Sequence, residues 1–317
     1  MREQLVERRE RVAAAISSAG PDLQLTALLR EVDAALQRFE SGTYGICETC
    51  HDTVEASRLI ANPLERFCLD HLSAREQRDL EADLSLAAEI QRGLLPGHNL
   101  RIDGWHFEYA YEPARMVSGD YVDIIQSGDD DLYFVLGDVS GKGIAASMLM
   151  AKLHAVFRSL IPLRLGVDQL TQRASRLFGD STLPGQYATL ICGRALKNGA
   201  VSVCNAGHPS ALLGRNGKIE EISATGLPLG MFCNQEFSAA NLRLESGDTL
   251  ILYTDGVVDA VNGQDEDYGV SRLLDIAKKS CSWDPEKFIA SCVSDLSRFR
   301  GSSPRFDDIS IMGIRRA

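Results

Sequence analysis

The sequence lacks the features that would place a protein in a membrane or on nucleic acid. No stretch approaches the roughly 20 consecutive apolar residues of a membrane-spanning helix, and residues 1–4 open a charged segment without the apolar centre of a secretory signal. Basic residues number 33 against 44 acidic ones, so no positive excess is available to neutralise phosphates. We therefore expect a cytoplasmic protein that does not enter a membrane, and we do not expect direct contact with nucleic acid.

Cysteine is too scattered for a framework of disulfides. Of the eight cysteines, only Cys47, Cys50 and Cys68 cluster. The other five stand singly in apolar stretches and are predicted to be buried free thiols: Cys192, Cys204, Cys233, Cys281 and Cys292. This usage fits a reducing compartment.

Length and composition predict a globular protein of more than one unit. The chain has 317 residues, of which 44% are hydrophobic and 24% are charged, as in ordinary globular proteins. A chain of this length usually forms two or more domains. Residues 2–18 and about 25–39 have helical spacing and are separated by Gly20 and Pro21. We predict a short helical hairpin that leads into the cysteine cluster.

A third helix is predicted over residues 73–95, ending at Pro96 and Gly97. Five of its positions step by four and three, as in a coiled-coil seam: Leu80, Leu84, Ala87, Gln91 and Leu94. Two alternatives stay open: the stripe packs on the neighbouring domain, or it joins two copies in a homodimer. The predicted organisation is residues 1–72, a linker helix at 73–97 and a domain at 98–317.

Beyond residue 98 the chain alternates short β-rich runs with a few helices. The predicted strands are 133–136, 188–191, 201–203, 211–213, 219–222, 249–253 and 309–312. The predicted helices are 144–160, about 168–178, about 270–277 and 285–299. Asn216-Gly217 between two of the strands is a strong hairpin signal. Successive strands with few helical crossovers indicate an α+β fold with antiparallel sheets and helices outside.

Four acidic positions share one local pattern, an aspartate at the end or start of an apolar strand beside glycine or another aspartate. They are Asp120, Asp138, Asp255 and the pair Asp307-Asp308. Aspartate is a poor strand residue, and a buried carboxylate is costly unless it is paired or binds a metal. A single Asp-Gly pair is usually a turn, but four such positions in one domain predict a divalent-metal site.

The residue types in this pattern point to magnesium or manganese chemistry. Clustered carboxylates repel one another, so bringing them together calls for a cation, and hard oxygen ligands select Mg²⁺ or Mn²⁺. Two such ions about 3.5–4 Å apart activate a bridging water and hold a phosphoryl group for in-line attack. That chemistry needs neither a nucleophilic cysteine nor a histidine base. The neighbouring glycines let the backbone approach the ions, so the Val139 carbonyl could also be a ligand.

Seven motifs, taken in order, resemble the bacterial SpoIIE/RsbU-like branch of the PPM (type 2C) protein serine phosphatases. They are Ala87–Pro96, Pro113–Tyr121, Gly137–Gly143, Asn205–Pro209, Gly226–Gly230, Tyr253–Gly256 and Asp307–Ser310, covering about 230 residues. The resemblance implies a two-sheet antiparallel β-sandwich flanked by helices, with two Mn²⁺ or Mg²⁺ ions at one end. It also implies metal-dependent hydrolysis of phosphoserine or phosphothreonine.

The resemblance carries over to individual positions. It implies metal-binding roles for Asp120, Asp138, Asp255, Asp307, Asp308 and the Val139 carbonyl, with Asp120, Asp138, Asp255 and Asp307 as the catalytic set. Ser118 stands where a second glycine is common in the family, which is a small departure. Eukaryotic relatives hold substrate phosphate with an N-terminal arginine that has no clear counterpart here. Lys142 is a candidate for that role, against the alternative of a solvated loop lysine, and His208 is predicted to be structural.

Cys47-x-x-Cys50, followed after seventeen residues by Cys68-x-x-His71, has the spacing of a zinc site. Two pairs of ligands, each two residues apart, form two knuckles around one tetrahedral ion. The stretch between them is polar and too short to fold without such a staple. His51 is a competing ligand outside this pattern. Four protein ligands leave no open position, so we predict a structural Zn²⁺.

Residues 36–50, 58–63 and Cys68 resemble the DksA/TraR zinc finger over about 40 residues. The last ligand of that family is normally cysteine, where His71 stands here. Members of the family act at RNA polymerase through a long helical hairpin with an acidic tip, whereas the hairpin here is short and residues 18–21 carry no such tip. We therefore expect the finger to sense, dock or dimerise.

The leading hypothesis is a phosphatase that acts on a regulatory protein. By family analogy, the substrate is a phosphorylated anti-sigma-factor antagonist in a partner-switching pathway, and the linker helix passes a signal to the catalytic domain. Two alternatives are a non-catalytic scaffold with a phosphatase fold and a zinc-finger transcription regulator. The complete set of aspartates argues against the first, and the acidic charge and lack of a basic helix argue against the second.

Overall fold

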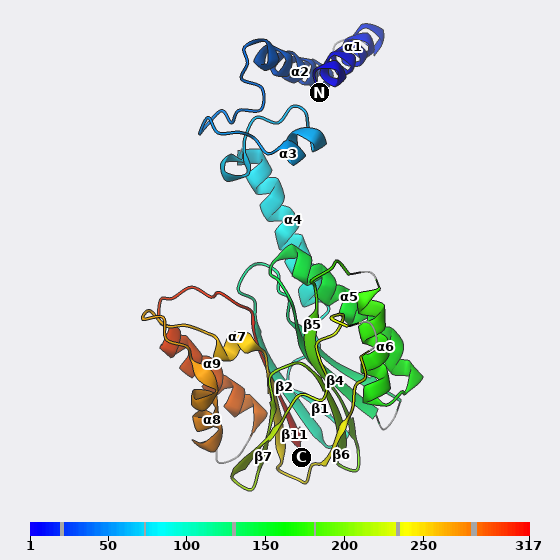
Figure 1. Cartoon of the computed structure of the whole chain (residues 1–317), viewed down its shortest axis with the longest axis vertical. Coiled ribbons are helices and arrows are strands. Elements are labelled where there is room, and N and C mark those ends of the chain that lie inside the picture. The colour runs from blue at the N-terminus through cyan, green and yellow to red at the C-terminus, as the bar shows by residue number, and fades with distance from the viewer. Residues whose placement is uncertain (20–21, 73, 129–130, 181, 233–234, 280–283) are drawn as a thin grey trace. The chain divides into compact units, whose positions relative to one another are not determined.

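The computed structural model of the protein describes residues 1–19, 22–72, 74–128, 131–180, 182–232, 235–279 and 284–317 (Figure 1). Within them the chain forms two compact units, Met1–Asp83 and Leu84–Ala317. Two predictions fall outside the described residues: the helix break at 20–21 and the thiols Cys233 and Cys281.

The first unit begins with two helices, α1 (Arg2–Ala19) and α2 (Leu23–Glu40), as predicted. The Asp22 side chain caps α2 by accepting a hydrogen bond from the Gln24 N–H at 2.9 Å. The helices pack through a small core, whose buried members are Leu5, Val32 and Ala35. A core of this size gives little stability, so the unit depends on further contacts.

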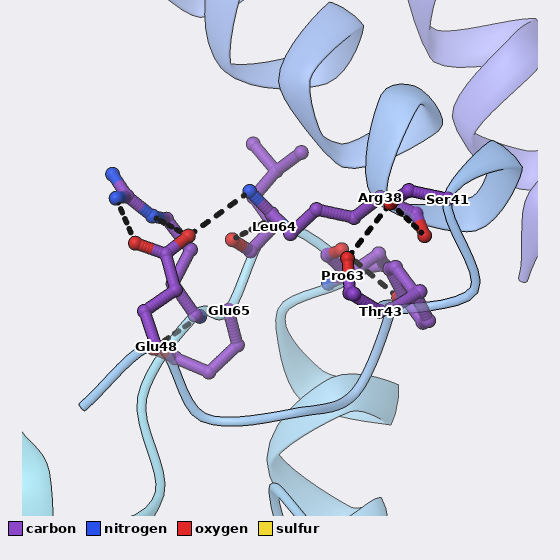
Figure 2. Close-up of polar contacts among 9 residues, drawn as sticks. Arg38, Ser41, Thr43, Glu48, Pro63, Leu64 and Glu65 are labelled. Carbon is purple, nitrogen blue, oxygen red and sulfur yellow. Dashed lines mark hydrogen bonds and ion pairs between the residues drawn. The ribbon is translucent and has the colours of Figure 1, made fainter. Parts of the chain in front are cut away.

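The zinc-finger segment follows α2 and is joined to it by polar contacts. Its short helices are α3 (Ala56–Ala61) and η1 (Leu69–His71). In Figure 2, Arg38 near the end of α2 donates to the Leu64 carbonyl at 3.3 Å and pairs with Glu48 at 3.6 Å. Polar contacts rather than extensive apolar packing thus join the helices to the finger, as expected of a small fold that relies on a metal staple.

Helix α4 (Ala74–Arg92) corresponds to the predicted linker helix, and its C-terminal half belongs to the second unit. In that half Gln91 is buried, and Leu94, just past the helix, packs against the core of the unit. Leu86 and Ile90 are exposed by 57% and 60%. Packing within the chain therefore accounts for the end of the predicted stripe, and the homodimer stays a prediction.

The second unit is a sandwich of two antiparallel sheets, which confirms the predicted fold class. The six-stranded sheet has the order β1-β2-β11-β10-β7-β8, with bounds β1 (Leu100–Ile102), β2 (Trp105–Glu112), β7 (Ala211–Arg215), β8 (Lys218–Ile222), β10 (Thr249–Tyr253) and β11 (Ile309–Arg316). The five-stranded sheet has the order β3-β4-β5-β6-β9, with bounds β3 (Tyr121–Ser127), β4 (Asp131–Val139), β5 (Ala188–Leu196), β6 (Ala200–Ala206) and β9 (Ala240–Arg243).

Alternation along the strands divides the core of the second unit into layers. In β4, Leu132, Phe134 and Leu136 face the opposite sheet. Tyr133 and Val135 face the helices outside, because successive strand residues point to opposite faces. The described thiols of this unit are free and buried, as predicted: Cys192, Cys204 and Cys292.

Helices cover the outer faces of both sheets (Figure 1). Those on the five-stranded sheet are α5 (Ile144–Leu160), η2 (Ile161–Leu163) and α6 (Val167–Gly179). Those on the six-stranded sheet are α7 (Asp255–Val258), α8 (Gly269–Lys279) and α9 (Pro285–Arg300). The loops at one end of the sandwich are thereby left free of helical cover and carry the aspartates.

One helix departs from the sequence prediction. We expected no segment near membrane-spanning length, yet among the described residues Ile144–Leu163 is long and apolar enough by length and composition alone. The buried side chains of α5 pack in the core against the five-stranded sheet, and they are Ala146, Met150, Leu153 and Phe157. The apolar character of the helix is thus explained by its place in the sandwich.

All seven predicted strands and all four predicted helices of this unit are present. Asn216-Gly217 forms the turn between β7 and β8, with φ of 50° and 75°. These left-handed values are those of a two-residue hairpin turn and favour Asn-Gly. Among the described strands, β1, β2, β3 and β9 had not been predicted.

Candidate metal centres

Strand register brings the first two aspartates of the cluster together. β3 and β4 pair so that Tyr121 lies opposite Gly137. Asp120 precedes β3 by one residue, and Asp138 follows Gly137 within β4, so the two carboxylates lie side by side at the same end of the five-stranded sheet. Asp120 is 1% exposed.

The six-stranded sheet supplies the other aspartates from the same end of the sandwich. β10 and β11 pair with Tyr253 opposite Ile311. Asp255 lies just beyond the end of β10, and the pair Asp307 and Asp308 lies just before the start of β11. Antiparallel pairing therefore places the end of one strand beside the start of the other, as the sequence pattern required.

Two hydroxyl groups join the sheets at this end. Both donate to Asp120 Oδ2, the Thr254 hydroxyl at 3.1 Å and the Ser310 hydroxyl at 2.5 Å. Thr254 also donates its N–H to the Ser310 carbonyl at 3.0 Å. Because Asp120 belongs to one sheet and the two hydroxyls to the other, these bonds fix the carboxylate across the sandwich.

Asp308 holds the loop that precedes Asp120. Its Oδ1 accepts from the Ala114 N–H at 2.7 Å, and its Oδ2 accepts from the Gly119 N–H at 2.8 Å. Both carboxylate oxygens are thus engaged with backbone groups. Asp307 has a different environment, because its Oδ2 lies 2.8 Å from Lys142 Nζ.

The aspartates are close enough to raise one another's pKa. Burial and the charge of Asp138 raise the pKa of Asp120 well above its usual range. Burial, with Asp255, Asp307 and Asp308 nearby, raises the pKa of Asp138 to about 7. Burial and Asp307 raise the pKa of Asp255. Carboxylates that resist ionisation in this way gain from a bound cation, and their hard oxygen donors fit Mg²⁺ or Mn²⁺.

The Val139 backbone lies against the loop that carries Asp120. Its N–H donates to the Gly119 carbonyl at 3.3 Å. A Cβ at Gly119 would stand 3.1 Å from the Val139 carbonyl oxygen and 3.4 Å from Asp138 Oδ1. The glycine thus leaves the approach to the carbonyl and the carboxylate open, as the sequence motif suggested.

Lys142 lies at the site, where it serves the protein's own groups. Besides Asp307, its ammonium contacts the Phe306 carbonyl. On the other side of the same loop, Arg115 Nη1 lies 3.7 Å from the position of a Cβ on Gly143. The sequence had offered Lys142 as the phosphate-binding residue and had given no role to Arg115.

His208 is built into the sandwich next to the cluster. Its N–H donates to Asn205 Oδ1 at 2.9 Å, and its Nδ1 lies 2.9 Å from the Thr189 hydroxyl. Thr189 is the cross-strand partner of Asp138. Burial lowers the pKa of His208 to about 3, so the ring is neutral near pH 7. This environment favours the predicted structural role.

Gln91 at the end of α4 is bonded to the Asp120 loop in both directions. Its Nε2 donates to the Ser118 carbonyl at 2.8 Å, and its Oε1 accepts from the Ser118 N–H at 2.9 Å. The linker helix therefore ends two residues away from a predicted metal ligand. Sequence reasoning had placed Gln91 in the helical stripe without assigning this contact.

Sequence reasoning missed four residues that shape this site. Thr254, Ser310, Gln91 and Arg115 all lie in motifs that were quoted for the family resemblance or directly within the predicted helix stripe. Their residue types alone gave no signal, since serine, threonine, glutamine and arginine are common at surfaces. Only the pairing of distant strands shows that their side chains meet the aspartates.

The cysteine cluster is assembled as the sequence predicted. Ligand atoms of Cys47, Cys50, Cys68 and His71 all lie within 4.8 Å of one another. Cys50 Sγ and Cys68 Sγ are 3.7 Å apart, and Cys68 Sγ is 3.3 Å from His71 Nδ1. Sulfur ligands about 2.3 Å from a tetrahedral zinc stand about 3.7 Å from each other, so the spacing fits. His51 is not part of the group.

The local backbone also prepares one of these thiols for a metal. Burial alone would raise the pKa of Cys47, but backbone N–H groups at Cys50, Cys68 and Thr49 bring it down to about 6. The thiolate, which is the form that binds zinc, is therefore favoured near neutral pH.

Comparison with known proteins supports both parts of the chain. Residues 128–317 match the family described as Stage II sporulation protein E (SpoIIE), and residues 42–70 match the prokaryotic dksA/traR C4-type zinc finger. Asp120 precedes the first of these matches, so its place in the site comes from the geometry. His71 likewise follows the second match and joins the cysteines in space.

Three similar proteins give the scale of the likeness. Protein IcfG of Synechocystis sp. is 31% identical over 77% of this chain and 43% of IcfG. Phosphoserine phosphatase RsbP of Bacillus subtilis is 29% identical over 56% of this chain and 45% of RsbP. The chain thus spans less than half the length of either relative. The SiaA-PP2C domain of Pseudomonas aeruginosa has a TM-score of 0.66 at 19% identity, covering 77% of this chain and 99% of that domain.

The solved domain shares the fold of the second unit, including its two sheets. The family match covers well over half of the chain and contains three of the four strand-end acidic positions. Together with the zinc-finger match, the assembled aspartates and the sandwich topology lead to one assignment. The chain belongs to the SpoIIE family and carries a DksA/TraR-type zinc finger ahead of its family domain.

Proposed function

We propose that this protein is a metal-dependent protein phosphatase that hydrolyses phosphoserine or phosphothreonine. The observation that carries the proposal is the convergence of five aspartates from two sheets on one end of the sandwich, where they raise one another's pKa. Such a set is costly without cations. Two divalent ions bound there supply activation of water and neutralisation of phosphoryl charge.

The roles of the residues follow from their contacts. Asp120, Asp138, Asp255 and Asp307, with the Val139 carbonyl, are proposed to hold the two Mn²⁺ or Mg²⁺ ions. Asp308, proposed from the sequence as a further ligand, has both oxygens bonded to the loop at 114–119 and would act by fixing that loop. Neutral His208 supports β5 beside the site and does not serve as the base.

The substrate is proposed to be a phosphorylated regulatory protein, and more narrowly an anti-sigma-factor antagonist in a partner-switching pathway. Support comes from the similarity to RsbP, a phosphoserine phosphatase by its name. The exposed setting of the site among loops also suits a protein substrate better than an enclosed pocket would, since Asp255 and Lys142 are both solvent-accessible.

The zinc-finger segment is proposed to be held by one structural Zn²⁺ bound to Cys47, Cys50, Cys68 and His71. We further propose that the linker helix dimerises through its exposed apolar face and influences catalysis through the Gln91–Ser118 contact. A cytoplasmic location, without membrane or nucleic-acid contact, remains our expectation from the sequence.

Hydrolysis of an aryl phosphate with added Mn²⁺ tests the catalytic proposal. Wild type should turn over the substrate, and Asp138→Asn should be strongly impaired while keeping its fold. Equal rates in both proteins, or no hydrolysis by wild type with Mn²⁺, Mg²⁺ or Co²⁺, would favour the alternative of a non-catalytic scaffold. A second assay with phosphoserine and phosphothreonine peptides then separates protein phosphatase activity from general phosphomonoester hydrolysis.

A further inference from the structure

Arg115 is an exposed arginine beside the aspartate cluster with no partner of its own. Within the described part of the chain, its guanidinium has no hydrogen bond or ion pair. The Nη1 atom lies 3.7 Å from the position of a Cβ on Gly143. Gly143 directly follows Lys142, which reaches Asp307 at 2.8 Å. The guanidinium therefore stands at the loop that borders the cluster.

The backbone that carries Arg115 is held firmly. The preceding residue, Ala114, and Gly119 farther along the loop both donate their N–H groups to Asp308. Ser118 exchanges two hydrogen bonds with the buried side chain of Gln91. A side chain with a fixed base and a free head loses little entropy when its head binds a ligand, which is the advantage of preorganisation.

Other cations near this end of the sandwich are already engaged. Lys142 is bonded to Asp307 and to the Phe306 carbonyl, so it neutralises the protein's own carboxylate. Arg305 pairs with Glu112 at 2.7 Å. Arg115 differs from both because all its donors are available to a ligand.

We propose that Arg115 binds the phosphoryl group of the substrate, donating two guanidinium N–H groups to two of its oxygens. The inference rests on the phosphatase function proposed above and adds a residue to it. A planar guanidinium matches two phosphate oxygens at once, which a lysine cannot do. The position of Arg115 at the rim lets it meet a phosphate that enters from solvent toward the aspartates.

The test compares Arg115→Ala, Arg115→Lys and a matched control, Arg173→Ala, which removes an exposed arginine from α6. All are assayed as full-length, manganese-loaded proteins on an aryl phosphate and a phosphoserine peptide. Arg115→Ala should lower kcat/KM on both by roughly 10- to 100-fold, the effect of losing hydrogen bonds to a charged group. Arg115→Lys should recover part of the loss, and Arg173→Ala should match wild type.

Inorganic phosphate provides a second readout that does not depend on turnover. Its dissociation constant, measured by calorimetry on the same loaded proteins, should rise by a similar factor in Arg115→Ala. An unchanged phosphate affinity together with unchanged kcat/KM would overturn the proposal and make Arg115 a solvated surface residue. If wild type binds phosphate through Arg115 yet hydrolyses nothing, the proposed phosphatase function fails while the binding role stands.

Discussion

The two candidate metal centres place opposite demands on the chain. In the finger, three thiols and an imidazole meet in a segment whose core includes only Cys47, Val54 and Cys68 as buried members. In the sandwich, the carboxylates stand at the edge of extensive apolar layers between and outside the sheets. One site has ligands with almost no scaffold, and the other has a large scaffold that forces like charges together.

The difference shows what each ion would contribute. A metal that supplies the missing core is part of the folding free energy, as in small zinc domains. A metal that binds prearranged carboxylates adds chemistry to a fold that stands without it. The hydroxyls that hold Asp120 and the backbone groups that hold Asp308 belong to the scaffold. The comparison can be tested by disturbing each site and measuring both units.

The largest effect is expected from removing zinc. Cys68→Ser, or a strong chelator, should unfold residues 42–72 because structural zinc contributes on the order of 10 kcal/mol in small fingers. Hydrogen exchange should show lost protection there and unchanged protection in β4, β5 and β11. Zinc content by mass spectrometry of the native protein checks the stoichiometry. Retained protection of the finger after complete zinc loss would contradict the contrast between the two centres.

The next largest effect is expected from Asp138→Asn. Hydrolysis should fall by roughly 100-fold or more, since even outer partners of metal ligands cost 10- to 100-fold. The fold should be kept, and thermal stability without divalent ions should match or exceed that of wild type, because the change removes a buried charge that Asp255, Asp307 and Asp308 oppose. Aryl phosphate kinetics and calorimetric melting measure the two sides separately. Collapse of the sandwich in this variant would mean that the carboxylate itself supports the fold.

Gly256→Ala tests how closely the scaffold is fitted around the site. A Cβ at this position would overlap the Asp308 carbonyl oxygen and lie 3.2 Å from Asp307 Cβ. Overpacking of this kind costs about 1–3 kcal/mol, and here it should also displace the aspartate pair and reduce hydrolysis. The matched control is Gly263→Ala, whose nearest neighbour would be the Ser303 hydroxyl at 3.9 Å.

Denaturant unfolding, followed by aryl phosphate assays at saturating Mn²⁺, measures these effects. Gly263→Ala should remain within about 0.5 kcal/mol of wild type, as is usual for a surface change. Equal stability of the two glycine variants would show that the turn after β10 is looser than the contrast assumes.

Sequence reasoning reached the scaffold and the ligands to different degrees. Asn216-Gly217 and the apolar run at 249–253 were decisive because a turn and a buried strand are local properties. β3 was missed because Asp123 interrupts its apolar run, and its burial depends on Arg158 from α5, whose two nitrogens donate at 2.9 and 2.7 Å. β2 was missed although Trp105 and the aromatic residues after it alternate with polar ones.

The site divides along the same line. Strand-end aspartates could be read from the sequence because a charge beside a buried strand is locally unusual. The hydroxyls of Thr254 and Ser310 could not, since their partner Asp120 lies 134 and 190 residues away. Arg115 gave no signal either, because an exposed arginine becomes informative only when its neighbours are known.

The smallest effect is expected from Ser310→Ala, which changes one bond of the scaffold and no proposed ligand. Ser310 is fully buried in β11, and its hydroxyl donates to Asp120 Oδ2 at 2.5 Å. Its loss leaves the Thr254 hydroxyl as the remaining side-chain donor to that oxygen among the described residues. Because partners that orient a ligand typically cost 10- to 100-fold in metal affinity, the Mn²⁺ concentration for half-maximal hydrolysis should rise by about 10-fold.

At saturating Mn²⁺ the rate of Ser310→Ala should approach that of wild type, which separates a weakened metal site from a damaged catalyst. Ser202→Ala on β6, whose hydroxyl bonds Asn241 away from the cluster, is the matched control and should leave the Mn²⁺ dependence unchanged. A normal Mn²⁺ dependence in Ser310→Ala would mean that Asp120 is held well enough by its strand alone. The carboxylate site would then resemble the finger more closely, with ligands that depend on the ion for their final positions.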